Sequence, residues 1–143
     1  MPRIRKMRAS DLAAVVAIER QITGSRRTSS LGRQLRTTLR ERESICLVAE
    51  IGGDVAGFLV GDLRPWEFGE DRPVAWVKVV GVDPRHQGGG IGRDLGRKFL
   101  AEARTRGARR VKTLVDWDAG DVVAYFRSLG FDRSGAIVLD RKA

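Results

Sequence analysis

One glycine-rich stretch has residues whose types and spacing could bind a phosphate group. Residues 87–92 read Gln-Gly-Gly-Gly-Ile-Gly, between a valine-rich run at 73–82 and an amphipathic run at 90–106. A strand that turns directly into a helix leaves unpaired N–H groups at the helix N-terminus, where the peptide dipoles add positive potential. Because glycine lets the backbone approach an anion closely, this stretch predicts a phosphate-binding loop.

Two common phosphate-binding motifs do not fit this loop. The Walker A motif requires Lys and then Ser or Thr after its last glycine, whereas Arg93 and Asp94 stand there. The dinucleotide fingerprint requires glycine or alanine three positions after its second glycine, and either way of counting finds Leu95 or Arg93 instead. The spacing that remains is Gln-x-x-Gly-x-Gly, carried by Gln87, Gly90 and Gly92.

The chain before residue 44 predicts one strand and two helices. A short strand covers 4–7, and a helix capped by Ser10 or Asp11 runs to Gly24 with apolar residues at helical spacing. A second amphipathic helix covers 28–43, with leucines along one stripe.

The middle of the chain predicts a hairpin followed by a further strand. Runs 44–51 and 55–62 are strand-like, and the glycine-rich turn at 52–54 joins them. The run 73–82 is rich in valine and contains Gly81, which predicts a bulge in this strand.

The last third predicts a helix at 90–106, a buried strand at 111–115, a helix at 119–129 and a final strand within 131–141. The order β-α-α-β-β-β-α-β-α-β indicates an α/β (α+β) fold. About four helices would flank a mixed, mostly antiparallel sheet with a parallel pair near its middle. A chain of 143 residues has room for one such domain, 1–143.

Composition adds weaker constraints. Lys and Arg total 27 against 18 Asp and Glu, a net charge of +9 that suits a solvated surface, a polyanionic ligand or nucleic acid. The single cysteine, Cys46, lies in an apolar run and predicts a buried thiol. No apolar run approaches the about 18 residues of a membrane span, and the N-terminus lacks the apolar core of a signal peptide. We therefore expect a cytoplasmic protein with neither a membrane segment nor a metal site.

The loop resembles the pyrophosphate motif of the GNAT superfamily of N-acetyltransferases. Besides the loop, the resemblance includes Val82-Asp83-Pro84 before it and the segment 126–131, Phe-Arg-Ser-Leu-Gly-Phe, which is similar to the family's aromatic-x-x-Leu-Gly-Phe signature. It covers nearly the whole chain. It implies acetyl-CoA as co-substrate, acetyl being the commonest acyl group in the family, and transfer by direct attack of an amine on the thioester.

The resemblance also implies roles for backbone groups. The pantetheine arm would lie beside the strand that bulges at Gly81, and an N–H group, that of Val82, would stabilise the oxyanion. Arg93 or Arg85 would reach the 3′-phosphate. The implied cofactor-binding residues are Val80, Val82, Gln87, Gly88, Gly89, Gly90, Ile91, Gly92 and Arg93.

Three positions depart from the family pattern. Phe126 replaces the tyrosine that protonates the departing thiolate, Ala119 replaces an asparagine, and Trp76 stands where some members carry a glutamate. Tyr125 is the remaining candidate acid, although it is about 100° around the helix from Phe126.

Candidate bases are the carboxylates near the expected reaction centre, while His86 is interpreted as a loop residue. These carboxylates are Asp116, Asp118, Glu67 and Glu70.

Three functions remain open. The first is an N-acetyltransferase for a primary amine of a small molecule or a protein, with loop 64–72, including Trp66 and Phe68, near the acceptor. The second is an acyl-CoA-binding sensor without catalysis, since the usual tyrosine and asparagine are missing. The third, nucleic-acid binding, is not favoured because no aromatic residues alternate with basic ones as base stacking requires. The short segment after Phe131 suggests a homodimer whose partner completes the sheet edge.

Overall fold

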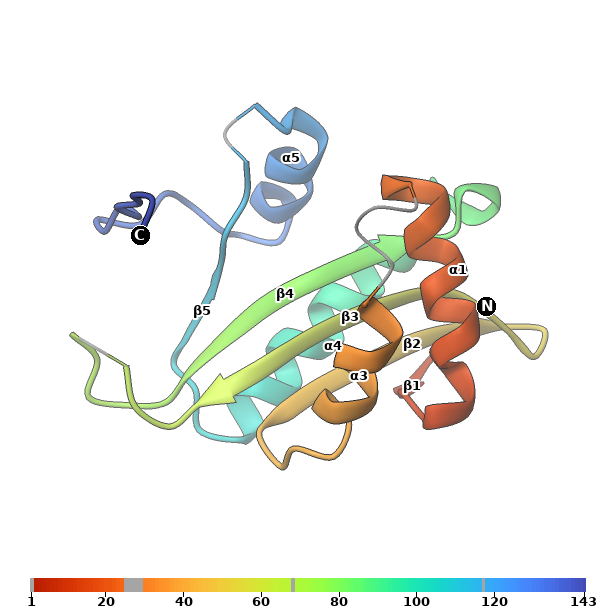
Figure 1. The fold of residues 1–143 in the computed structure, drawn as a ribbon, viewed down its shortest axis with the longest axis horizontal. Helices are drawn as coiled ribbons and strands as arrows, with labels where there is room; N and C mark the ends of the chain where they lie inside the picture. Colours follow the sequence, from red (N-terminus) through yellow and green to blue (C-terminus); the bar gives the residue numbers. More distant parts are fainter. Residues whose placement is uncertain (1, 25–29, 68, 117) are drawn as a thin grey trace.

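The computed structural model describes residues 2–24, 30–67, 69–116 and 118–143. Five strands form one sheet in the order β1-β2-β3-β4-β5 (Figure 1). All neighbours pair antiparallel except β4 and β5, which are parallel. The strands are β1 (Arg3–Lys6), β2 (Ser44–Ile51), β3 (Asp54–Arg64), β4 (Val74–Val82) and β5 (Arg110–Thr113).

Helices cover both faces of this sheet (Figure 1). One face packs against α4 (Ile91–Thr105), whose Leu95 and Phe99 are fully buried. The other face packs against α1 (Leu12–Thr23) and α3 (Leu31–Thr38). The last helix, α5 (Gly120–Ser128), follows β5 and packs against α4. The mixed sheet between helices confirms the α/β (α+β) fold class.

The expected elements before residue 82 are largely present. Gly52 and Gly53 have φ of 58° and 90°, so the turn uses the left-handed backbone that glycine allows. The second helix is shorter than the predicted 28–43: it ends at Thr38, and Thr28 lies outside the described residues. In α1, Ile18 rather than Ile22 lies in the core, and Ile22 is exposed.

The predicted bulge at Gly81 is wrong. Gly81 pairs regularly with Phe58, and the register of β3 against β4 shifts where Val60 and Gly61 oppose Val79 and Val77. Lys78 is therefore the extra residue. Gly81 has a different reason to be glycine, because a Cβ there would lie 2.7 Å from the ring of Phe58.

The predicted last strand is also wrong for the part of the chain that the structure describes. Residues 132–143 form no strand and are exposed, and β5 ends at Thr113 instead of residue 115. The hydrogen bonds that involve residues 132–143 are local to the segment, so no sheet edge holds it in place. As a result, the parallel pair β4–β5 lies at the edge of the sheet rather than near its middle.

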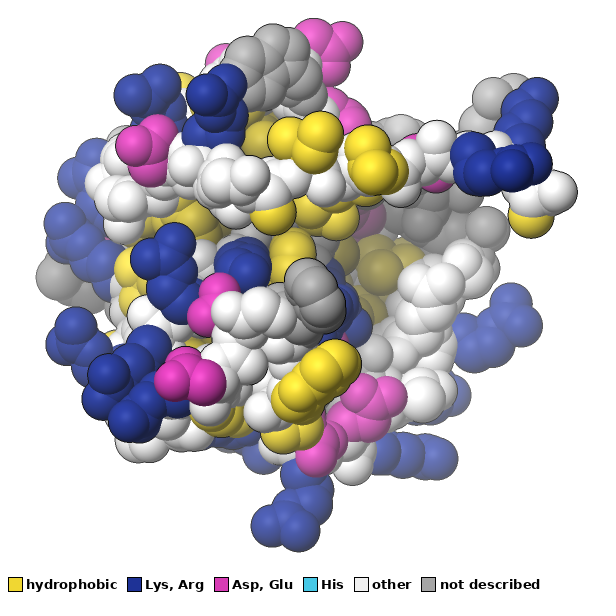
Figure 2. Space-filling model, turned by 90° about the vertical axis from the view of Figure 1, so that its left-hand side faces the viewer, with side chains coloured by type: hydrophobic (Ala, Val, Ile, Leu, Met, Phe, Trp, Pro, Cys, Tyr) yellow, Lys and Arg dark blue, Asp and Glu magenta, His cyan; other side chains and the backbone are white. Residues whose placement is uncertain are grey.

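The charge is distributed rather than gathered into one stripe. On the face shown in Figure 2, Lys and Arg side chains alternate with acidic and apolar ones. Among the described residues, no helix is both long enough and apolar enough to cross a bilayer.

Candidate functional site

The glycine loop lies between β4 and the N-terminus of α4. Gly88 and Gly90 have φ of 86° and 83°, and Gly90 is the N-cap of the helix. The first intrahelical bond runs from Asp94 N to Gly90 O at 2.9 Å, so the preceding amides of Ile91, Gly92 and Arg93 have no helical acceptor. A Cβ placed on Gly88 or Gly90 would meet nothing within 4 Å. The loop thus presents free N–H groups beneath open space, the arrangement that a phosphate needs.

A buried aspartate fixes the entry to this loop. The side chain of Asp83 accepts from the Arg85 backbone N at 3.0 Å and from Arg85 Nη2 at 2.8 Å. These hydrogen bonds lower the pKa of Asp83 to about 2, which keeps it ionised. The Arg85 guanidinium is committed to Asp83, so Arg93, which is exposed, is the better placed of the two arginines for a phosphate. His86 is partly exposed in the same turn.

Next to the loop, β4 has an unpaired edge. Its parallel partner β5 pairs only with Val74–Val77, and the last pair is secured by Thr113 Oγ1 donating to Val77 O at 3.0 Å. Beyond it, residues 78–82 of β4 have no partner on this side in the described part of the chain. Val80 and Val82 belong to this unpaired stretch, so their backbone groups lie on a free strand edge that continues into the glycine loop.

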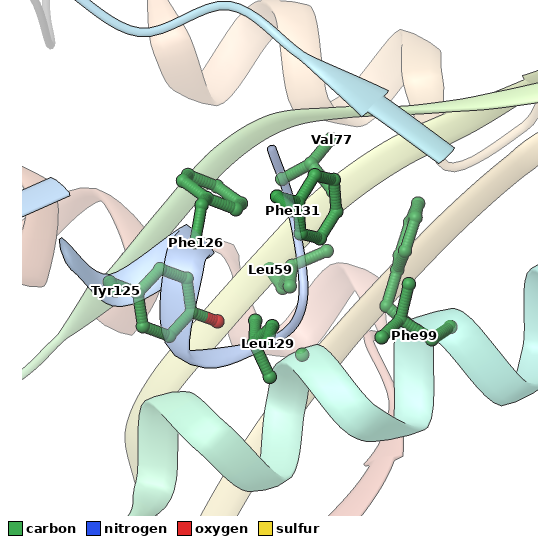
Figure 3. A pocket seen from close by; sticks show the side chains of 9 residues that line it. Leu59, Val77, Phe99, Tyr125, Phe126, Leu129 and Phe131 are labelled. Carbon is green, nitrogen blue, oxygen red and sulfur yellow. The ribbon is translucent and has the colours of Figure 1, made fainter. Parts of the chain in front are cut away.

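Tyr125 lies between α5 and the start of α4 (Figure 3). Its hydroxyl donates to Gly92 O at 2.7 Å, and burial raises its pKa to about 12. A Cβ on Gly96 would lie 2.9 Å from that hydroxyl oxygen and 2.5 Å from Leu129. Glycine at 96, which the sequence analysis did not identify, is therefore required for α5 to pack on α4.

Aromatic rings extend this contact. The ring of Phe126 packs edge-on against Tyr125 at 4.9 Å and against Phe131 at 5.1 Å, between centroids. Together with α4 and the sheet they line an apolar pocket that has no room for a water molecule (Figure 3). The segment that carries the family signature therefore serves here as packing between α5, α4 and the sheet.

A network of charged side chains lies beside the point where β4 and β5 separate. Trp76 Nε1 donates to both carboxylate oxygens of Glu67, at 2.9 and 3.1 Å. Lys112, which pairs with Trp76 across β4–β5, lies 3.8 Å from Glu67 and 3.3 Å from Glu70. The Arg64 guanidinium stacks over the Trp76 ring at 4.9 Å. The structure thus brings together Glu67 and Glu70, two of the expected carboxylates.

Asp62 and Lys78 complete the network and were missed by sequence reasoning. Asp62 Oδ2 lies 2.8 Å from Lys78 Nζ, the residue of the bulge. Asp62 Oδ1 is buried and accepts no hydrogen bond from the described residues, although Arg64 Nε is 3.7 Å away. A signal did exist: each is a charged residue in an otherwise apolar strand run.

Alternation along β3 fixes the face on which this carboxylate lies. Phe58 and Val60 point into the core under α1 and α3, so Asp62, two residues further, lies on that same face. By contrast, Asp116 and Asp118 are exposed in the connection from β5 to α5. Ala119 precedes α5 as its N-cap.

Known proteins with related sequences are acetyltransferases. The chain is 39% identical over 95 residues to a mycothiol acetyltransferase of Saccharomonospora viridis, covering 64% of this chain and 31% of that protein. It is 42% identical over 89 residues to a mycothiol acetyltransferase of Amycolatopsis mediterranei, and the match covers 60% of this chain and 29% of that protein. The chain thus spans about a third of the length of these relatives.

Solved structures share the whole fold at low identity. A transcriptional regulator from Bacillus halodurans superposes with a TM-score of 0.87 at 21% identity, over 99% of this chain and 100% of that one. The aminoglycoside N-acetyltransferase AAC(6′)-Iy in complex with CoA superposes with a TM-score of 0.86 at 18% identity. The superposition covers 99% of this chain and 95% of that one.

The model of the acetyltransferase (GNAT) family matches residues 12–131, which include the sheet from β2 onward, the glycine loop and the Phe126–Phe131 segment. The loop, the unpaired edge of β4 and this match agree, and the chain belongs to the GNAT acetyltransferase family.

Proposed function

We propose that the protein is an acetyl-CoA-dependent N-acetyltransferase acting on a primary amine. The observation that carries this proposal is the continuity of two backbone features. Free amides at the start of α4 would hold the pyrophosphate, and the unpaired edge of β4 would hold the pantetheine arm beside it. Both features are built from main chain, so the missing family side chains do not weaken them.

In this proposal, nine residues form the co-substrate site. Backbone groups of two β4 residues would bond the pantetheine amides, the loop amides would bind the pyrophosphate, and Arg93 would approach the 3′-phosphate. Gln87, whose Nε2 donates to Val82 O at 3.4 Å, would hold the loop against the end of β4. The nine are Val80, Val82, Gln87, Gly88, Gly89, Gly90, Ile91, Gly92 and Arg93.

The reaction needs two proton transfers. The lone pair of the neutral amine attacks the thioester carbonyl carbon, so that a C–N bond forms and the C–S bond breaks. One proton leaves the amine nitrogen and one ends on the sulfur of coenzyme A. The protein must accept the first proton, and it stabilises the charge that develops on the carbonyl oxygen through a backbone N–H, for which Val82 is the candidate.

We propose that the carboxylates at the bulge accept the first proton, the one that leaves the amine nitrogen. Asp62 is mostly buried, has a free oxygen atom, and lies next to Lys78 at the start of the unpaired β4 edge. Glu67 is already bonded to Trp76 and paired with lysine, which suits it to orienting an acceptor. Asp116 and Asp118 remain alternatives, but both are exposed.

For the second proton we favour water over Tyr125. The Tyr125 hydroxyl already donates its proton to Gly92 O, so it is engaged in holding the start of α4. In this proposal Tyr125 positions the start of α4.

The acceptor is proposed to be a small polar amine. The names of the relatives, mycothiol and aminoglycoside acetyltransferases, support a small molecule over a protein. The carboxylates beside the bulge offer hydrogen-bond acceptors to a cationic, hydroxylated acceptor. We propose a cytoplasmic location, where acetyl-CoA is made and a lone thiol such as Cys46 stays reduced.

The test combines binding with turnover. Calorimetry with acetyl-CoA and with free coenzyme A measures the affinity of the co-substrate site. Thiol release in the presence of a panel of amino sugars and polyamines measures acetyl transfer. The assay background is low because the single cysteine is buried. Binding together with amine-dependent thiol release supports the transferase, whereas binding without release from any amine supports an acyl-CoA sensor. Absence of binding by the folded protein refutes both.

A further inference from the structure

We propose that the protein has a second anion-binding site, which takes a small molecule with two or more phosphate groups at the end of α4 opposite the glycine loop. The site is an open hollow of about 440 Å³ that is lined by Arg72, Arg104, Gly107, Ala108 and Arg109. This inference goes beyond the proposed acetyl transfer and does not depend on it.

Three segments bring the arginines to this hollow. Arg72 belongs to the loop before β4, Arg104 to the last turn of α4, and Arg109 to the connection from α4 to β5. The parallel pairing of β4 with β5, in which Val74 faces Arg110, brings the loop before β4 beside the start of β5. Tertiary packing therefore gathers these positive charges at one place.

No described carboxylate neutralises the hollow. Arginines elsewhere pair with acidic side chains: Arg85 lies 2.8 Å from Asp83, for example. By contrast, the guanidinium groups of Arg72, Arg104 and Arg109 form no ion pair or hydrogen bond with a described residue. Grouped like charges repel one another, and an anion bound between them relieves that repulsion.

The end of α4 does not need these arginines for its own backbone. Basic side chains near a helix C-terminus can bond the last carbonyl groups, but here backbone amides do so. The amide of Ala108 donates to Ala103 O and the amide of Gly107 donates to Arg104 O, both at 3.0 Å. Gly107 has a φ of 97°, as glycine has at such a helix end. The guanidinium groups are therefore left for a ligand.

Charge and size indicate the class of ligand. Guanidinium groups bind phosphate through paired N–H donors, and three of them suit more than one phosphate group. The volume of the hollow falls within the range of small-molecule sites, about 300–1,000 Å³. A nucleic-acid backbone fits less well, because basic side chains alternate with acidic ones on the face shown in Figure 2 and form no stripe for a strand to follow.

The hollow is separate from the glycine loop. The loop comes directly before α4, whereas Gly107 follows the last turn of that helix (Figure 1). With 15 residues, α4 is about 22 Å long. A small phosphate compound bound at one end therefore does not reach the other end.

Calorimetry of the whole chain with inorganic tripolyphosphate, at low and fixed ionic strength, tests the proposal. The measurement is made in Gly90→Trp, in which the large side chain blocks the glycine loop, and one site should remain. Adding Arg104→Gln with Arg109→Gln should lower the affinity at least about 10-fold, because two charge-assisted contacts are lost. Arg33→Gln with Arg36→Gln is the matched control: it removes two exposed arginines from α3 and should change the affinity less than about two-fold.

Amide-correlation NMR spectra of the wild type give a second measurement, which decides the outcome if Gly90→Trp does not fold. Tripolyphosphate should shift the signals of Gly107 and Ala108, and these shifts should vanish in Arg104→Gln with Arg109→Gln. Thermal unfolding checks that each variant is folded.

Three results would overturn the proposal. The first is an equal loss of affinity in both double variants, which would assign the binding to overall charge. The second is the absence of any shift at Gly107 and Ala108 in the folded wild type. The third is binding of a single-stranded oligonucleotide that depends on Arg104 and Arg109 while tripolyphosphate does not bind, which would indicate a nucleic-acid site.

Discussion

The glycine loop and the bulge network both adjoin β4 but are built in opposite ways. The loop at 87–93 offers backbone amides, and side chains support it from its surroundings: Arg85 bonds Asp83 at its entry, and the Tyr125 hydroxyl donates to Gly92 O. The network at the β4 bulge is made of side chains from β3, β4, β5 and the loop between β3 and β4, of which Asp62, Glu67 and Lys112 are examples.

This difference matches the tasks proposed for the two regions: the loop binds a group common to every acyl-CoA, and the network recognises one particular acceptor. A pyrophosphate is the same in every acyl-CoA, so a main-chain site suffices and tolerates change in the surrounding side chains. An amine acceptor varies, and side chains brought from several strands can be changed one at a time. We therefore expect substitutions in the loop to abolish binding of the co-substrate, and substitutions at the bulge to alter turnover and acceptor choice.

The largest effect is expected from Gly90→Trp. A large side chain at the helix N-cap would occupy the open space above the amides, and the affinity for acetyl-CoA should fall by about 10³-fold, or about 4 kcal/mol. Calorimetry measures this directly. Gly107→Trp is the matched control, because Gly107 also has positive φ, at 97°, and open space around it, but lies at the far end of α4. If both variants lose affinity equally, backbone strain and not the loop is responsible.

A smaller effect, confined to turnover, is expected from Asp62→Asn. If Asp62 accepts the amine proton, kcat should fall by about 10²-fold while the affinity for acetyl-CoA is unchanged. Stopped-time thiol-release assays at saturating acetyl-CoA measure kcat, and Asp118→Asn provides the comparison with an exposed carboxylate. A loss of kcat in Asp118→Asn but not in Asp62→Asn would move the base to the connection before α5.

The smallest effect is expected from Tyr125→Phe, which tests how far the two regions are independent. Loss of the bond to Gly92 O should lower the free energy of unfolding by about 1 kcal/mol and the melting temperature by about 2–4 °C. The KM for acetyl-CoA should rise a few-fold while kcat stays nearly constant, since Tyr125 positions the start of α4. A fall in kcat of about 10²-fold or more with an unchanged KM would instead identify Tyr125 as the acid.

Sequence patterns predicted the elements that depend on local signals. Turn glycines such as Gly52 and Gly53, and the strand-loop-helix order around Gly90, are encoded within a few residues. The two errors concern pairing between distant segments. The bulge falls at Lys78 because of how β4 registers with β3, and residues 131–141 form no strand because they pair with no other strand of the described chain. A glycine in a strand signals a close contact as readily as a bulge, and at Gly81 the contact is with Phe58.

For this protein, the sequence alone determined the family resemblance and the position of the proposed main-chain phosphate site, because a glycine loop at a helix N-terminus is specified by local backbone geometry. Only the tertiary structure decided which side chains face the proposed acceptor. Asp62 and Trp76 face each other because β3 and β4 pair in one particular register, and Lys112 joins them through the parallel pairing of β4 with β5. Tyr125 meets Gly92 for a similar reason: α5 approaches α4 only where Gly96 leaves room. Such contacts depend on packing between segments far apart in the chain, which no local pattern specifies.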